Sequence, residues 1–216
     1  MLGRHANTRT ARLTLMLALM ASAPAVAQER LPPIGAEKMT EAQKKAAADL
    51  VTTLGFAPRG PFAVMLRVPE VMDLAGKWRQ HLRTRSVLDQ RLTEFVILVA
   101  ARHWTQQYEW NAHAPAAIKA GLKPEIVAAV AEGRRPNQMA EDESALYDLL
   151  TELLHTHGVS DPTYARALVK LGEDGIVEAT STAGYYALLA MVMNTARTPL
   201  APGTQIPLAP FPSSAR

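Results

Sequence analysis

The chain contains no cysteine among its 216 residues. This absence excludes a thiol nucleophile, a disulfide and a thiolate metal site, and with them thiol peroxidase and disulfide reductase chemistry. The sequence also lacks a Gly-rich phosphate loop, a G-x-S-x-G elbow and an H-x-x-x-H or H-E-x-x-H zinc motif. We therefore expect neither a metal nor a cofactor.

Acidic residues are absent from the beginning of the chain, which has the layout of a secretory signal peptide over residues 1–27. A basic stretch, an apolar run too short to span a bilayer and an Ala-x-Ala cleavage pattern follow one another: Arg4, Arg9 and Arg12, then 13–21, then Ala25, Val26 and Ala27. We predict cleavage after Ala27 and a periplasmic or secreted protein. An uncleaved N-terminal anchor is the alternative.

The basic balance of the whole chain comes from this leader. The formal net charge is +3, with 23 basic and 20 acidic side chains, and the leader holds three of the arginines and no acid. A mature chain without excess positive charge gives no reason to expect a nucleic-acid partner. We also expect no membrane association after cleavage.

Strand patterns are nearly absent, and short Gly- and Pro-containing breaks separate segments with helical periodicity. We predict an all-α domain of seven to eight helices over 28–200, followed by a Pro-rich tail at 201–216 that is free to lie over a neighbouring subunit. Thr40, Thr105 and Asp161 are the expected N-caps. The expected helices are 41–54, 69–82, 89–103, 106–120, 124–133, 141–157, 161–171 and 175–197, with a short turn at 62–67.

Glu94 is the first candidate site residue, because it precedes the apolar run FVILVAA in a helix that is apolar on every side. A carboxylate in such a helix must be paired, hydrogen-bonded or protonated. One interpretation is a structural ion pair with Arg91 or Arg102. The other is a carboxylate that orients a catalytic imidazole.

Glu109 and His113 are four residues apart on the next helix and therefore share a face. Small alanines beside them would let another helix approach, so the pair is expected to face an interhelical crevice with Glu94. A solvated surface pair is the alternative. Tyr108 and Gln106 open the same helix, and Trp110 is expected to lie in the core or in the wall of a pocket.

The segment TEFVILVAARHWTQQYEWNAHAPAAIKAGL resembles the carboxymuconolactone decarboxylase family, which shares its fold with the alkylhydroperoxidase D-like proteins. The resemblance extends over roughly 68–200. In the peroxidase branch, a glutamate is followed by a C-x-x-C pair and then by a histidine. Here the corresponding positions hold Glu94, Gln106, Glu109 and His113, with Tyr108 between the two that replace the thiols. The chain is thus similar to the decarboxylase branch, which also lacks the thiol pair.

The resemblance implies an all-α homo-oligomer, a trimer or hexamer, and cofactor-free decarboxylation of a small carboxylated lactone or related acid. By transfer, His113 is the expected proton donor, and Glu94 orients it. Glu109 and Tyr108 are then polar groups of the pocket. Arg91 or Arg102 would neutralise the substrate carboxylates.

Two other functions remain open on the same scaffold. One is a non-catalytic protein that binds a small molecule or a partner, which would show a sealed Glu94–arginine pair without a cavity beside His113. The other is a different acid–base enzyme, such as a lactone hydrolase or isomerase, because fold alone does not determine the reaction.

Overall fold

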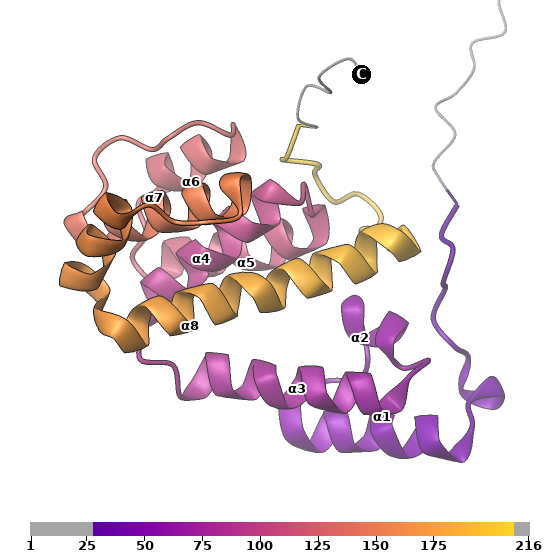
Figure 1. The fold of residues 1–216 in the computed structure, drawn as a ribbon. Coiled ribbons are helices and arrows are strands. Elements are labelled where there is room, and N and C mark those ends of the chain that lie inside the picture. Colours follow the sequence, from indigo (N-terminus) through magenta and orange to yellow (C-terminus); the bar gives the residue numbers. More distant parts are fainter. Residues whose placement is uncertain (1–27, 210–216) are drawn as a thin grey trace, which may run out of the picture.

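The computed structural model describes residues 28–209, and these residues form eight α-helices, one short 3-10 turn and no strand (Figure 1). The predicted all-α fold is therefore confirmed. The elements are η1 (Ala36–Lys38), α1 (Glu41–Leu54), α2 (Pro61–Met65), α3 (Pro69–Thr84), α4 (Gln90–His103), α5 (Gln107–Lys119), α6 (Pro124–Ala131), α7 (Glu141–Thr156) and α8 (Asp161–Ala196). The predicted signal peptide and residues 210–216 of the predicted tail lie outside the described residues.

Local capping signals set several helix starts. The Thr40 hydroxyl accepts a hydrogen bond from the Gln43 N–H, and the Gln43 side chain accepts one from the Thr40 N–H, which forms a capping box before α1. At α4, the Asp89 carboxylate accepts from the Leu92 N–H at 2.8 Å. Proline occupies the first turn of α3 and α6. Backbone N–H groups in the first turn have no acceptor within the helix, so the N–H that proline lacks costs no hydrogen bond.

Two of the three expected caps are wrong. Thr105 has a φ of +49° and lies in the turn between α4 and α5, and the side chain of Gln106 caps α5 by accepting from the Tyr108 N–H. Asp161 is the first residue of α8, and Ser160 precedes it as N-cap. The last two expected helices, 161–171 and 175–197, both form, and they meet within α8 at Gly172, whose φ of 69° and ψ of 174° are not helical and are unstrained only for glycine.

The core has two parts, and α4 and α8 are shared between them. One cluster packs α4 against α5, α6 and α7, with Leu98, Ile126 and Leu146 fully buried. The other packs α1, α2 and α3 against α8 and includes Met72 and Tyr185. Figure 1 shows α8 crossing the molecule between α1 and α3 on one side and α4 to α7 on the other.

The apolar character of α8 follows from this position. Within residues 28–209, it is the one helix that is long and apolar enough to cross a membrane by length and composition. Half of its most apolar window is buried inside the molecule. Burial against α2, α3, α4 and α7 accounts for that composition without a bilayer.

The described part of the C-terminal tail packs on its own chain, whereas we expected it to be free for a neighbouring subunit. Leu208 is fully buried in the cluster around α4. The Gln107 side chain donates to the Leu208 carbonyl at 2.5 Å and accepts from the Leu208 N–H at 3.1 Å. Arg102 donates to the Ala209 carbonyl at 2.8 Å. The tail is thus an extended strap across α4 and α5.

Candidate active site

Glu94 lies in the middle of the site, on the first turns of α4. Its side chain is fully buried. One carboxylate oxygen accepts from Arg83 of α3 at 2.5 Å, and the other contacts Nδ1 of His113 of α5 at 2.7 Å. The carboxylate therefore joins three helices, and both of its oxygens are satisfied, as burial of a charge requires.

The charge state of Glu94 follows from these partners. Burial alone raises the pKa of this carboxyl, but the hydrogen bond and charge of His113, together with those of Arg83, lower it further than burial raises it. The net pKa lies below the usual value, so Glu94 is ionised at neutral pH. The expected ion pair is real, but the arginine is Arg83 rather than Arg91 or Arg102.

His113 connects this buried carboxylate to open space. Since an ionised carboxylate can only accept, Nδ1–H of His113 donates to Glu94, and Nε2 becomes the basic nitrogen of the neutral ring. Nε2 has no hydrogen-bond partner among residues 28–209, and the side chain is 16% exposed. The ring packs edge-on against Tyr186 of α8, with ring centroids 5.1 Å apart.

A cavity of about 260 Å³ lies beside His113. Aromatic and aliphatic side chains make up most of its wall, and four polar or charged groups interrupt it, as in many small-molecule sites. The aromatic and aliphatic side chains of the wall are Phe56, Pro61, Phe62, Tyr108, Ala112, Tyr186 and Leu189. The four polar or charged groups are those of Arg59, Arg79, Glu109 and His113.

Glu109 also lines this cavity but has an environment opposite to that of Glu94. It is 3% exposed, and neither carboxyl oxygen has a hydrogen-bond partner among the described residues. Burial raises its pKa well above the usual value, with no cation to oppose the shift. The raised pKa favours the neutral, protonated form of Glu109, which can donate a hydrogen bond or a proton.

The remaining candidates of α5 separate into one cavity residue and two structural ones. Tyr108 lies in the cavity wall. The Gln106 side chain donates to Asn194 of α8 at 2.7 Å and caps α5, so it fixes the α4–α5 turn rather than facing the cavity. Trp110 is 3% exposed within the core cluster around α4.

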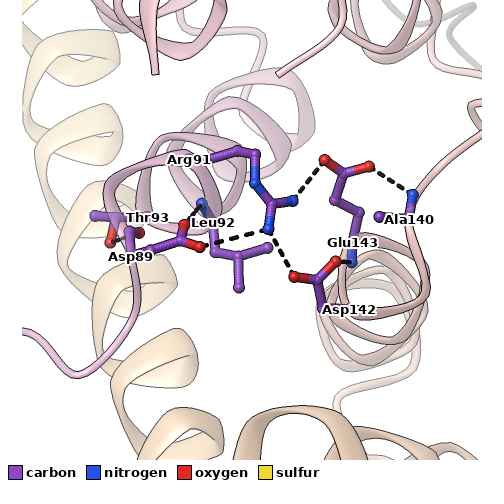
Figure 2. A network of polar contacts seen from close by, with 7 residues as sticks. All are labelled: Asp89, Arg91, Leu92, Thr93, Ala140, Asp142 and Glu143. Atoms are coloured by element: carbon purple, nitrogen blue, oxygen red, sulfur yellow. Dashed lines mark hydrogen bonds and ion pairs between the residues drawn. The ribbon is translucent and has the colours of Figure 1, made fainter. Parts of the chain in front are cut away.

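Arg91 does not line the cavity, and Figure 2 shows its contacts with acidic side chains. Its guanidinium reaches the start of α7, where it donates to Asp142 and to Glu143 at 2.6 Å each, and Asp89 lies at 3.4 Å. Arg102 points to the opposite end of α4 and donates to the tail. The structure therefore brings neither arginine to the cavity that contains His113.

The sequence reasoning missed the arginines that are present at the site. Arg79 and Arg83 are four residues apart on α3, so they share a face of that helix. We expected this helix to end at 82, which left Arg83 outside it. Extending the helix to Thr84 would have placed both arginines on one face, which is the signal that could have found them.

The site can be compared with known proteins on this geometry. Residues 69–152, which hold Arg79, Arg83, Glu94, Tyr108, Glu109 and His113, match the model of the carboxymuconolactone decarboxylase family. Over those residues the chain is similar to this family. The site also includes residues outside the matched range, on α8 and before α2, so the similarity covers the acid–base pair and only part of the cavity.

Solved structures with the same fold are distant in sequence. A cysteine-to-alanine variant of the debrominase Bmp8, in complex with 2,3,4-tribromopyrrole, is 12% identical, with a TM-score of 0.64 over 84% of this chain and 95% of that one. An uncharacterised peroxidase-related protein from Ralstonia eutropha JMP134 with an alkylhydroperoxidase AhpD core is 15% identical, with a TM-score of 0.62 over 81% and 93%. A sequence comparison with curated proteins gives no match. These similarities confirm the alkylhydroperoxidase D-like fold. They do not identify the reaction, which we infer from the geometry of the site.

Proposed function

We propose that the protein is a cofactor-free acid–base enzyme that decarboxylates a small unsaturated acid or carboxylated lactone. The observation that carries this proposal is the buried Glu94–His113 pair, whose unpartnered ring nitrogen belongs to a residue lining a cavity of about 260 Å³. Such a carboxylate–imidazole arrangement fixes the tautomer and the orientation of the histidine.

The reaction needs one proton and a place for negative charge. When the bond to the carboxylate breaks, its electron pair passes into the conjugated carbonyl and CO₂ leaves, which gives an enolate. Protonated His113 then transfers its Nε2 proton to carbon, and water restores that proton. Glu94 remains ionised throughout and orients the imidazole, while His113 and Arg83 keep Glu94 ionised.

Neutral Glu109 supplies the second requirement. A carboxylate beside an anionic substrate would repel it, but a protonated acid can donate a hydrogen bond to the oxygen of the enolate as charge develops there. Burial keeps Glu109 in that form. The two glutamates of the site thus have opposite charge states because their surroundings differ.

The cavity supports an enzyme over a purely structural pair. A sealed Glu94–arginine pair with no space beside His113 would favour a non-catalytic scaffold, but here a cavity accompanies the pair. A hydrolase or isomerase that uses the same groups would also need the cavity. The substrates of the assay must therefore extend beyond one lactone.

We further propose that the protein is exported and works as a homo-oligomer. The layout of residues 1–27 supports export. Apolar side chains on one stretch of α3 support an oligomer, since Val71, Leu74 and Trp78 are 43%, 66% and 40% exposed. A trimer or hexamer is the expected form from the family resemblance.

A turnover assay tests the proposed reaction. The mature chain from Gln28 would be incubated with carboxymuconolactone, other unsaturated lactones and 2-keto acids, and release of CO₂ would be followed. We expect release from the wild type, loss of at least two orders of magnitude in His113→Ala, and little change in His155→Ala, an exposed histidine on α7. No release from any compound by a folded wild type would refute the decarboxylase proposal. Unfolding of His113→Ala would instead assign the pair a structural role.

A further inference from the structure

Two further arginines line the same cavity as His113. Arg59 lies in the connection between α1 and α2, and Arg79 lies on α3. Both guanidinium groups lie near one aromatic ring, since the central carbons of Arg59 and Arg79 are 4.8 Å and 5.3 Å from the centroid of Phe56. Two elements that are close in sequence, the α1–α2 connection and α3, thus bring two cations and an aromatic ring to one cavity.

Neither arginine has a carboxylate or carbonyl partner among the described residues. This distinguishes them from Arg83, which pairs with Glu94, and from Arg91 and Arg135, which pair with acids of α7. A guanidinium that borders an apolar cavity and lacks a counter-ion has its full set of donors available to a ligand. Planar anions, carboxylates above all, match that donor geometry.

The loop that carries Arg59 is held close to the cavity. Gly60 has a φ of +53°, and a Cβ at this position would lie 2.6 Å from Cε1 of Tyr108. Glycine is therefore required both by the backbone and by the packed ring. Because Pro61 starts α2 immediately afterwards, Arg59 has little freedom to move away from the cavity wall.

We infer that Arg59 and Arg79 form an anion-recognition subsite, and that the ligand of this cavity is a small planar unsaturated carboxylate. Its carboxylate contacts the guanidinium groups, and its flat part packs against Phe56 and Tyr108. The remaining end faces His113 and Glu109. This inference rests on the proposed function for the identity of the reacting end, but the anion-binding end stands on the geometry alone.

The carboxylate held by the arginines is one that the reaction retains. A cation paired with the departing carboxylate stabilises the ground state more than the transition state, in which that charge is leaving, and would slow the reaction. The departing group is therefore placed away from Arg59 and Arg79. The arginines select the substrate, and the residues of α4 and α5 act on it.

Calorimetric titration with simple probes tests the subsite. The probes are 2-furoate, its uncharged amide 2-furamide, and inorganic phosphate, each in low-salt buffer. We expect 2-furoate to bind at least about tenfold more tightly than the amide or phosphate, and Arg59→Gln and Arg79→Gln each to weaken 2-furoate about tenfold with no effect on the amide. Arg85→Gln is the matched control, because it removes the same charge from an exposed residue outside the cavity.

The outcomes separate this inference from the proposed function. Binding of 2-furoate that survives in His113→Gln, and that weakens with added salt, supports an anion subsite independent of turnover. The anion subsite is refuted if the wild type binds no anion, if it binds 2-furoate and 2-furamide equally, or if it binds phosphate more tightly. It is also refuted if Arg85→Gln weakens 2-furoate as much as the two cavity variants do. Each of these results counts even if CO₂ release depends on His113. If Arg79→Gln does not fold, Arg79→Lys replaces it in the titration. Lysine keeps the positive charge but lacks the paired N–H donors of the guanidinium group, so Arg79→Lys should bind 2-furoate more weakly than the wild type.

Discussion

At the scale of single residues, the buried carboxyl of Glu109 makes the free energy of unfolding depend on pH. Below its ordinary pKa, the carboxyl is protonated in both the folded and the unfolded chain. Above that value, only the unfolded chain releases the proton, because burial raises the pKa of Glu109 in the folded state. Unfolding therefore becomes more favourable as the pH rises, by about 1.4 kcal/mol per pH unit until the folded pKa is reached.

The variant Glu109→Gln removes this titration while keeping the size of the side chain. We expect the free energy of unfolding of the wild type to fall relative to that of Glu109→Gln between pH 5 and pH 8. Urea unfolding of both proteins across that range measures the difference. Parallel pH curves for the two proteins would show that Glu109 is ionised in the folded state.

Glu94 should show both a structural and a chemical effect. Glu94→Gln leaves Arg83 buried without its charged partner and His113 without a carboxylate, so we expect a loss of about 3 kcal/mol of stability and no detectable CO₂ release. Glu143→Gln is the matched control, because Glu143 is 4% exposed and pairs with Arg91 away from the cavity. It should lower the stability and keep the activity. Full activity in Glu94→Gln would contradict the assigned orienting role.

The sequence predicted the meeting of Glu94 and His113 but not the arginine that joins them. Two apolar neighbouring helices must pack, and their polar residues then share the interface, so this contact follows from periodicity. An arginine side chain can reach in many directions, and its choice of partner depends on tertiary placement. Arg91 turned to α7 instead, where Asp142 and Glu143 offer two acids.

At the scale of elements, helix starts were predicted well where capping is local. The expected range of α1 agrees with the structure, because Thr40 and Gln43 form a capping box within the sequence itself. The start of α5 was misplaced by one residue, because Thr105 adopts a positive φ in a turn closed by a hydrogen bond from the Gln106 N–H to the Ala101 carbonyl, and periodicity does not predict a positive φ at a threonine. The expected division between 161–171 and 175–197 agrees with the structure, because the backbone at Gly172 is not helical and separates two helical parts of α8.

The connection before α2 offers a test of how backbone conformation holds the cavity. Gly60→Ala would strain a residue with a φ of +53° and displace the ring of Tyr108. Gly55→Ala is the matched control, because Gly55 also has a positive φ, of +77°, but no atom lies within 4 Å of the place that its Cβ would take. We expect each to lose about 1 kcal/mol from backbone strain. Only Gly60→Ala should weaken 2-furoate, and equal binding by the two variants would contradict the role of Gly60.

At the scale of the whole molecule, the candidate site lies where the two parts of the core meet. Phe62, Tyr186 and Leu189 of the cavity wall belong to the cluster that α8 forms with α1, α2 and α3. Glu109 and His113 come from α5, on the other side of α8. Relative movement of the two parts would change the distance between the arginines and His113, so the packing of α8 also sets the geometry of the site.

The C-terminal strap contributes to this packing, and two neighbouring residues separate its contribution. Leu208 is fully buried, whereas Ile206 is 72% exposed. We expect Leu208→Ala to reduce the free energy of unfolding by about 2–4 kcal/mol and Ile206→Ala to change it by less than about 0.5 kcal/mol. Urea unfolding of the mature chain measures both, and sedimentation measures the mass of each variant. If the tail instead belongs on a neighbouring subunit, Leu208→Ala would reduce the mass of the assembly. If the strap is only loosely attached, the two variants would be equally stable, because neither side chain would then leave water on folding.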